Sequence, residues 1–244
     1  LLANMAAMYA CYHGPDGLRK IAGRVHGLAR FLAAGLERLG HTVVHASYFD
    51  TLAVKHATQS AADLARIAEA YRINLRVLDE QTVGVALDET SSEADVLELL
   101  QVFNEGRDVP FELEELTAAE IIPATLLRSS EFLIHEVFHK HRSETELMRY
   151  LKRLESRDLS LAQSMIPLGS CTMKLNAAAE MQPVSWPEFN GVHPFVPTGQ
   201  TAGYRKMFTE LETWLVEITG FAAVSLQPNA GSQGEYAGLL AQDR

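Results

Sequence analysis

A long helical repeat near the start of the chain most constrains its fold. Between Asp16 and Leu39, apolar residues recur every three or four positions: Leu18, Ile21, Val25, Leu28, Phe31, Leu32 and Leu36. This spacing predicts one helix with a single buried face. Gly40 should end it in a left-handed turn. An apolar helical stretch, residues 1–12, precedes it, and Gly14-Pro15 should break the chain between the two, with Pro15 beginning the second helix.

Short strands and helices alternate after this helix. Residues 42–46, 48–54, 75–78 and 81–87 have strand character, whereas residues 60–70 and 96–103 are helical. Ser92 and Asp95 are spaced as a capping box in front of the second helix. The pattern predicts an open-faced α/β layer with its helices on one side of a sheet. We therefore assign residues 41–120 to a small α/β domain.

The rest of the chain divides into an arm and a new domain. A second capping box, Ser143 with Glu146, begins an amphipathic helix that should turn Leu147, Tyr150, Leu151 and Leu154 inward. Residues 165–203 contain five prolines and several aromatic residues, which indicates an ordered arm packed on another surface. Residues 204–219 should form a helix that ends at Gly220. The expected division is 1–40, 41–120, 121–203 and 204–244.

Charge and composition exclude some classes of protein. The net charge is −10, which argues against a nucleic-acid partner because such partners require a clustered basic surface. No apolar run approaches the roughly 20 residues that span a bilayer, so a membrane partner is not expected. Two widely separated cysteines in 244 residues do not form a disulfide framework and suggest a reducing compartment.

Residues 221–241 form the first candidate site. They are predicted to form a strand, a turn at 229–231 and a helix beginning near Ser232. The free amides of a helix start attract phosphate or carboxylate, and Gly231, Ser232 and Gln233 would hold it. No cation lies between Phe221 and Ala241. A plain strand–helix turn is the alternative, and the residues alone favour it.

A second candidate is the segment LGSCTMKLN at residues 168–176. It gathers hydrogen-bond donors, a nucleophile and a cation in an irregular stretch, as loops that line sites often do. Its candidates for lining a site are Ser170, Cys171, Thr172, Lys174 and Asn176. A surface turn with a buried cysteine would explain the same residues.

A third pattern, His135-Glu136-x-x-His139, matches the zinc hydrolase motif. On a helix, the two histidines would share one face and Glu136 would act as general base. The following capping box places the histidines near a helix boundary. We therefore favour an exposed charged turn and expect no metal there.

Three stretches give the chain a family resemblance. They are LLANMAAMYACYHGPDGLRKIAGRVH at the N-terminus, SMIPLGSCTMKLNAAAEMQPVSWPEFNGVHPFVP in the arm, and GYRKMFTELETWLVEITGF with SLQPNAGSQGEYAGL near the end. They closely resemble the P-protein of the glycine cleavage system, a pyridoxal-phosphate enzyme of fold type I built from two homologous halves. The resemblance covers essentially the whole chain and is loosest at residues 104–141, where the histidine motif falls.

The resemblance implies a function and a place for this chain within a longer protein. Residues 1–40 would end the large domain of the first half, 41–120 would be its small domain, and 204–244 would open the large domain of the second half. The family decarboxylates glycine on pyridoxal phosphate and passes the aminomethyl group to the lipoyl arm of the H-protein. The cofactor lysine is expected beyond Arg244, so this chain would be an inactive piece without a catalytic residue. Gly231, Ser232 and Gln233 would bind the cofactor, and His193 would join the residues that line the site.

The resemblance also implies an assembly and a compartment. The complete protein would be a homodimer or a heteromer of its two halves, located in the bacterial cytoplasm or, in a eukaryote, the mitochondrial matrix. The competing hypotheses are a non-catalytic scaffold that completes a partner's site and a zinc hydrolase that uses His135 and His139.

Overall fold

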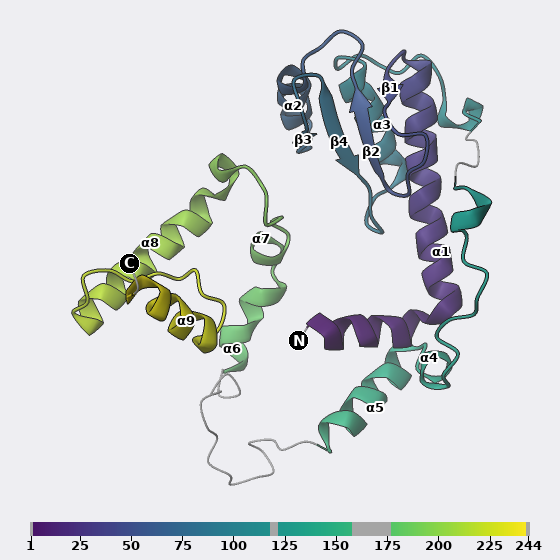
Figure 1. The fold of residues 1–244 in the computed structure, drawn as a ribbon. Coiled ribbons are helices and arrows are strands. Elements are labelled where there is room, and N and C mark those ends of the chain that lie inside the picture. Colours follow the sequence, from purple (N-terminus) through teal and green to yellow (C-terminus); the bar gives the residue numbers. More distant parts are fainter. Residues whose placement is uncertain (1, 118–121, 158–176, 243–244) are drawn as a thin grey trace. The chain divides into compact units, whose positions relative to one another are not determined.

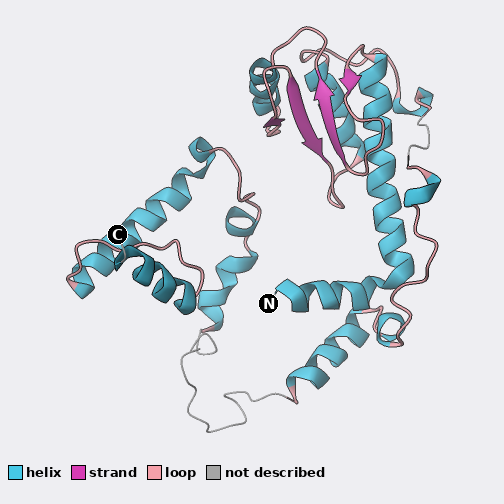
Figure 2. Cartoon of the chain, viewed as in Figure 1, coloured by secondary structure: helices cyan, strands magenta, loops and turns pink. Residues whose placement is uncertain are grey.

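The structure is a computed structural model that describes residues 2–117, 122–157 and 177–242. The chain divides into two compact units, Leu1–Pro167 and Leu168–Arg244. The first unit contains the sheet, and the second, where described, is helical (Figure 2). Within the part of the chain that the structure describes, no helix has the length and apolar character needed to cross a membrane.

Helix α1 (Leu2–Arg38) is two helices joined at a kink. Gly14 has φ 61° and ψ −178°, a conformation that essentially only glycine adopts, and Pro15 begins the second part. The Arg142 side chain covers this kink and donates to the Phe138 carbonyl at 3.2 Å. The helix ends as predicted: Gly40 has φ 89°, and the His41 N–H donates to the Leu36 carbonyl at 2.9 Å.

The sheet has four antiparallel strands in the order β1-β2-β4-β3. They are β1 (Thr42–Val43), β2 (Thr51–Lys55), β3 (Arg76–Val77) and β4 (Thr82–Ala86). Leu52 pairs with Val85 and Val54 with Val83, and all four side chains are buried. Side chains at the alternating positions of these strands, such as Thr51 and Ala86, are exposed. One face of the sheet is therefore covered and the other is open.

Three helices cover the buried face: α1, α2 (Ala61–Ala70) and α3 (Glu93–Phe103) (Figure 1). The two helices predicted at 60–70 and 96–103 are confirmed as α2 and α3. Ser60 caps α2, and Ser92 and Asp95 form a complete capping box on α3. Helices α1 and α3 approach closely at Gly35, where an added Cβ would lie 2.6 Å from a δ carbon of Leu100. The predicted mixed helix–sheet layer is therefore present.

Phe31 does not lie on the buried face of α1, contrary to the prediction, and is 38% exposed. The buried stripe runs through Val25, Leu28, Leu32 and Leu36. Residue 31 is rotated about 100° from Leu32 around the helix axis, which takes it to the border of that stripe.

The predicted helix at 143–155 forms as α5 (Glu144–Glu155), with the Glu146 N–H donating to the Ser143 hydroxyl at 3.3 Å. Its expected inward face is not buried. Leu151 and Leu154 are exposed, and no side chain of α5 is buried against the residues that the structure describes. Before it lie the 3₁₀ turns Leu113–Glu115 and Ala124–Leu126 and the short helix α4 (Val137–Lys140).

The second unit consists of short helical turns followed by two longer helices. They are α6 (Ala178–Met181), 3₁₀ turns at Gln182–Ser185 and Thr198–Thr201, α7 (Pro187–Asn190), α8 (Ala202–Thr219) and α9 (Gly231–Gln242). Helix α8 ends at Gly220 in the left-handed region, as predicted. The predicted strand at 221–226 is absent. A strand requires a neighbour for its backbone hydrogen bonds, and residues 177–242 include no other strand.

Candidate functional site

The start of α9 gathers the three residues predicted to bind an anion. Gly231, Ser232 and Gln233 occupy its first turn, as the sequence predicts, and all three are exposed. The helical ladder begins with the Gly234 N–H, which donates to the Ala230 carbonyl at 3.0 Å. The amides of residues 231–233 therefore lie ahead of the first intrahelical bond of α9, where helix geometry provides them no partner.

Gln233 has a contact that the sequence did not predict, and its role in binding an anion stays a prediction. Its side-chain oxygen accepts the Asn229 N–H at 2.7 Å, so the side chain folds back over the turn before α9. A glutamine at the third helical position commonly closes such a turn. This bond uses the oxygen of Gln233 and fixes its side chain over the 229–231 turn, while the side-chain NH2 group, the part that could donate to an anion, is not engaged by it.

The other polar side chain in the first turn of α9 is that of Ser232, which ends in a hydroxyl. It is exposed, and the positive end of the α9 dipole lies beneath it. The arrangement offers a set of N–H donors and one hydroxyl to a small anion. It offers no acid, base or nucleophile, so on its own it can bind a group but cannot transform it.

Most of the predicted site-lining residues lie outside the described residues: Ser170, Cys171, Thr172, Lys174 and Asn176. His193 is described and exposed. Its Nδ1 accepts the Phe195 N–H at 3.0 Å, and its ring lies 5.9 Å from that of Phe195. These contacts order the turn that contains His193, and its role in a site stays a prediction.

The histidine motif does not have the geometry of a zinc site. Helix α4 begins at Val137, so His135 precedes it and does not share a helical face with His139. The two ring nitrogens of His139 lie 3.0 Å from the Leu133 carbonyl and 3.1 Å from the Arg142 guanidinium. Among residues 2–117, 122–157 and 177–242, no three His, Cys, Asp or Glu side chains are grouped so as to hold a metal ion.

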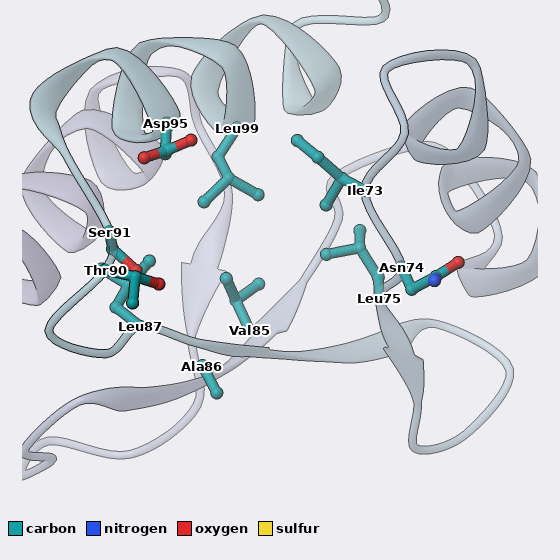
Figure 3. A pocket seen from close by; sticks show the side chains of 10 residues that line it. All are labelled: Ile73, Asn74, Leu75, Val85, Ala86, Leu87, Thr90, Ser91, Asp95 and Leu99. Atoms are coloured by element: carbon teal, nitrogen blue, oxygen red, sulfur yellow. The ribbon is translucent and has the colours of Figure 1, made fainter. Parts of the chain in front are cut away.

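A shallow hollow in the small domain was not foreseen from the sequence. It has a volume of about 230 Å³ and lies between α3, the end of β4 and the segment before β3 (Figure 3). Apolar Leu99 of α3 and Val85 of β4 line it from opposite sides, and Asp95 of α3 also borders it. The carboxylate of Asp95 accepts the Ser92 N–H at 2.7 Å, and hydrogen bonding from Ser92 holds the pKa of Asp95 below its ordinary value. Asp95 is therefore occupied in capping α3.

Comparison with known proteins relates the chain to one family. Residues 1–103 match the family model described as glycine cleavage system P-protein. Over 98% of its length, the chain is 54% identical to a protein of Nostoc sp. strain PCC 7120 named glycine dehydrogenase (decarboxylating). The chain is related to the P-proteins. Proteins of the same name from Cupriavidus metallidurans and Synechocystis sp. are 55% and 56% identical over 98% of the chain.

The chain spans about a quarter of the length of these P-protein relatives, 25%, 25% and 24% respectively. Their similarity extends well beyond the 103 residues of the family model and takes in the helix start at 231–233.

Among solved structures, a NifS-like protein aligns over 37% of this chain and 29% of its own chain, at 20% identity and a TM-score of 0.34. A likeness of this size does not establish a shared fold.

Proposed function

We propose that this chain is part of a pyridoxal-phosphate-dependent glycine decarboxylase of the P-protein type. The observation that supports this most strongly is the 53–56% identity, over nearly the whole chain, to proteins named glycine dehydrogenase (decarboxylating). Because the chain spans a quarter of these relatives, the activity belongs to the longer protein. The proposal includes fold type I, with the small antiparallel domain as the end of the first half.

The donor set at the start of α9 fits the phosphate end of the cofactor. A phosphate ester carries up to two negative charges, which helix-start amides and a serine hydroxyl bind well. In our proposal the amides of residues 231–233 and the Ser232 hydroxyl hold the phosphate, while Gln233 keeps the preceding turn in place through Asn229. Ser170, Cys171, Thr172, Lys174, Asn176 and His193 would line the remainder of the site.

Pyridoxal phosphate, when bound, supplies a conjugated ring that accepts electrons as a carboxylate leaves. The chain's own residues bind and orient that group. The substrate would be glycine and the partner the lipoyl-bearing H-protein. The relatives named above are bacterial, so we place the activity in the cytoplasm, in a homodimer or a heteromer of the two halves.

The phosphate assignment is tested in a complete P-protein that contains this segment. Ser232→Ala should weaken pyridoxal phosphate binding by about 1–3 kcal/mol, the usual range for a lost hydrogen bond to a charged group. Gln233→Ala should also weaken it, because it removes a side-chain donor and the bond that holds the turn in place. Gln242→Ala, at the far end of α9, is the matched control and should leave the affinity unchanged.

Cofactor affinity is measured by fluorescence titration, and glycine decarboxylation is followed at low and high cofactor concentration. Activity of the Ser232 variant should recover partly as cofactor increases. Equal affinities for the Ser232 and Gln242 variants would refute the phosphate assignment and leave the family relationship intact. A complete protein with normal cofactor binding and no turnover of glycine would refute the function itself.

A further inference from the structure

Two buried histidines converge on one carbonyl oxygen in the small domain. His41 follows the turn that ends α1, His56 follows β2, and Phe103 is the last residue of α3. The Nε2 atoms of His41 and His56 lie 3.1 and 2.9 Å from the Phe103 oxygen. The two ring centroids are 4.2 Å apart, and the side chains are 8% and 5% exposed.

The partners of these rings determine where their protons lie. A carbonyl oxygen only accepts, so both Nε2 atoms must carry hydrogen. The Nδ1 of His41 accepts the Ala57 N–H at 3.3 Å, and that of His56 accepts the N–H groups of Thr58 and Gln59 at 3.2 and 2.9 Å. In this arrangement each ring donates from Nε2 and accepts at Nδ1. A second proton on either ring would point at a backbone donor.

The pair joins three segments that are distant in sequence. The Phe103 carbonyl belongs to the last turn of α3, where carbonyls lack intrahelical partners, and the two histidines supply them. The Nδ1 bonds hold the loop between β2 and α2 in the conformation that leads to the Ser60 cap. Losing these bonds would release the end of α3 and this loop together.

Charged groups on the neighbouring elements modify the protonation of His41. The Glu105 carboxylate accepts from the Gln59 side chain at 3.1 Å and favours the charged form of His41. Arg107 pairs with Glu105 at 2.9 Å and opposes that influence. Further charged groups on the adjoining elements include Glu37 and Arg38 at the end of α1, Lys55 at the end of β2, Asp63 in α2 and Glu98 in α3.

We propose that His41, packed against His56, forms an acid-sensitive latch: protonation of His41 opens the loop of residues 56–60 and the end of α3 before the rest of the sheet domain unfolds. In this buried site His41 cannot accept a proton at Nδ1 without losing its hydrogen bond from the Ala57 N–H.

The pH range follows from linkage. Burial first, and then the neighbouring His56, lowers the pKa of His41 to about 4 from the ordinary 6.5. The opened segment takes up a proton below pH 6.5 while the closed one does not, so closure weakens as the pH falls from 6.5 to about 4. For His41 alone, the opening equilibrium constant should rise about 20-fold between pH 7 and pH 5.

Hydrogen exchange with mass spectrometry on the 244-residue chain measures this opening, after correction for the pH dependence of intrinsic exchange. Peptides covering 56–60 and 103–107 should show the 20-fold increase, while peptides from β4 should not. His41→Gln should reduce the increase to about 2-fold or less, whatever its effect on overall stability, because the pH dependence and not the absolute level is compared. Exposed His45→Gln is the matched control and should behave as the wild type.

A measurement on the unaltered chain covers the case in which the variant fails to fold. Nitrogen-15 chemical shifts should show both His41 and His56 protonated at Nε2 at pH 7, and His41 should stay neutral until well below pH 6.5. The latch is refuted by His41 titrating near pH 6.5, by a proton on Nδ1, or by exchange that rises equally in β4. It is equally refuted if the His41 variant keeps the full pH dependence.

Discussion

Replacing Gly35 with alanine tests the close packing of α1 on α3. The added methyl would lie 2.6 and 2.8 Å from the two δ carbons of Leu100, which is fully buried and cannot turn toward solvent. Overpacking of this kind costs about 1–3 kcal/mol. Alanine in place of a helical glycine contributes about 1 kcal/mol in the opposite direction. We expect Gly35→Ala to destabilise the domain by about 1 kcal/mol.

Gly23→Ala is the matched control in the same helix. An added Cβ there has no atom within 4 Å, and Gly23 is exposed. Only the helix propensity changes, so this substitution should stabilise the domain by about 1 kcal/mol. The two alanine variants therefore differ in sign.

A double-mutant cycle isolates the contact. Leu100→Ala alone should cost about 2–5 kcal/mol, and Gly35→Ala made in that background should become stabilising because the obstructing δ carbons are gone. Free energies of unfolding come from urea titrations of the four proteins. The m-value, the slope of this free energy against urea concentration, should be the same for all four. The packing argument would be wrong if Gly35→Ala stabilised the wild type as much as Gly23→Ala does.

Three further predictions concern other parts of the chain. Gly14→Ala should destabilise the first unit by roughly 1–3 kcal/mol in urea unfolding, because alanine strains a φ of 61° and its Cβ would lie 2.7 Å from the Phe138 oxygen. The purified chain should bind less than one equivalent of zinc at His135 and His139, and a chelator should leave its Tm unchanged; one tetrahedrally bound equivalent would contradict this. Limited proteolysis should first cleave within 165–203, since no described side chain of residues 177–203 is buried, and uniform resistance along the chain would contradict it.

Local signals explain which elements could be predicted from the sequence. The helix ends at Gly40 and Gly220 and the cap at Ser92 depend on the conformation and hydrogen bonds of a few neighbouring residues, and all three are confirmed. The predicted strand at 221–226 and the buried face of α5 failed for a different reason. Each needs a partner surface that a local pattern does not contain.

The same distinction applies to the candidate site. The helix start at 231 could be predicted, since glycine and serine before an apolar run mark it locally. The folding back of Gln233 onto Asn229 could not, because a side-chain amide has several possible partners. The pair His41 and His56 gave no sequence signal, since their meeting point, Phe103, lies 62 and 47 residues further along the chain.

The lengths of the strands in the small domain affect how copies of it meet. The central strands β2 and β4 have five residues each, but the edge strands β1 and β3 have only two. A short edge presents few unpaired backbone groups to another chain, and Arg76 on β3 adds a charge there. We therefore expect concentrated samples of this domain to resist association through strand addition, so that any self-association arises from exposed helical surfaces instead.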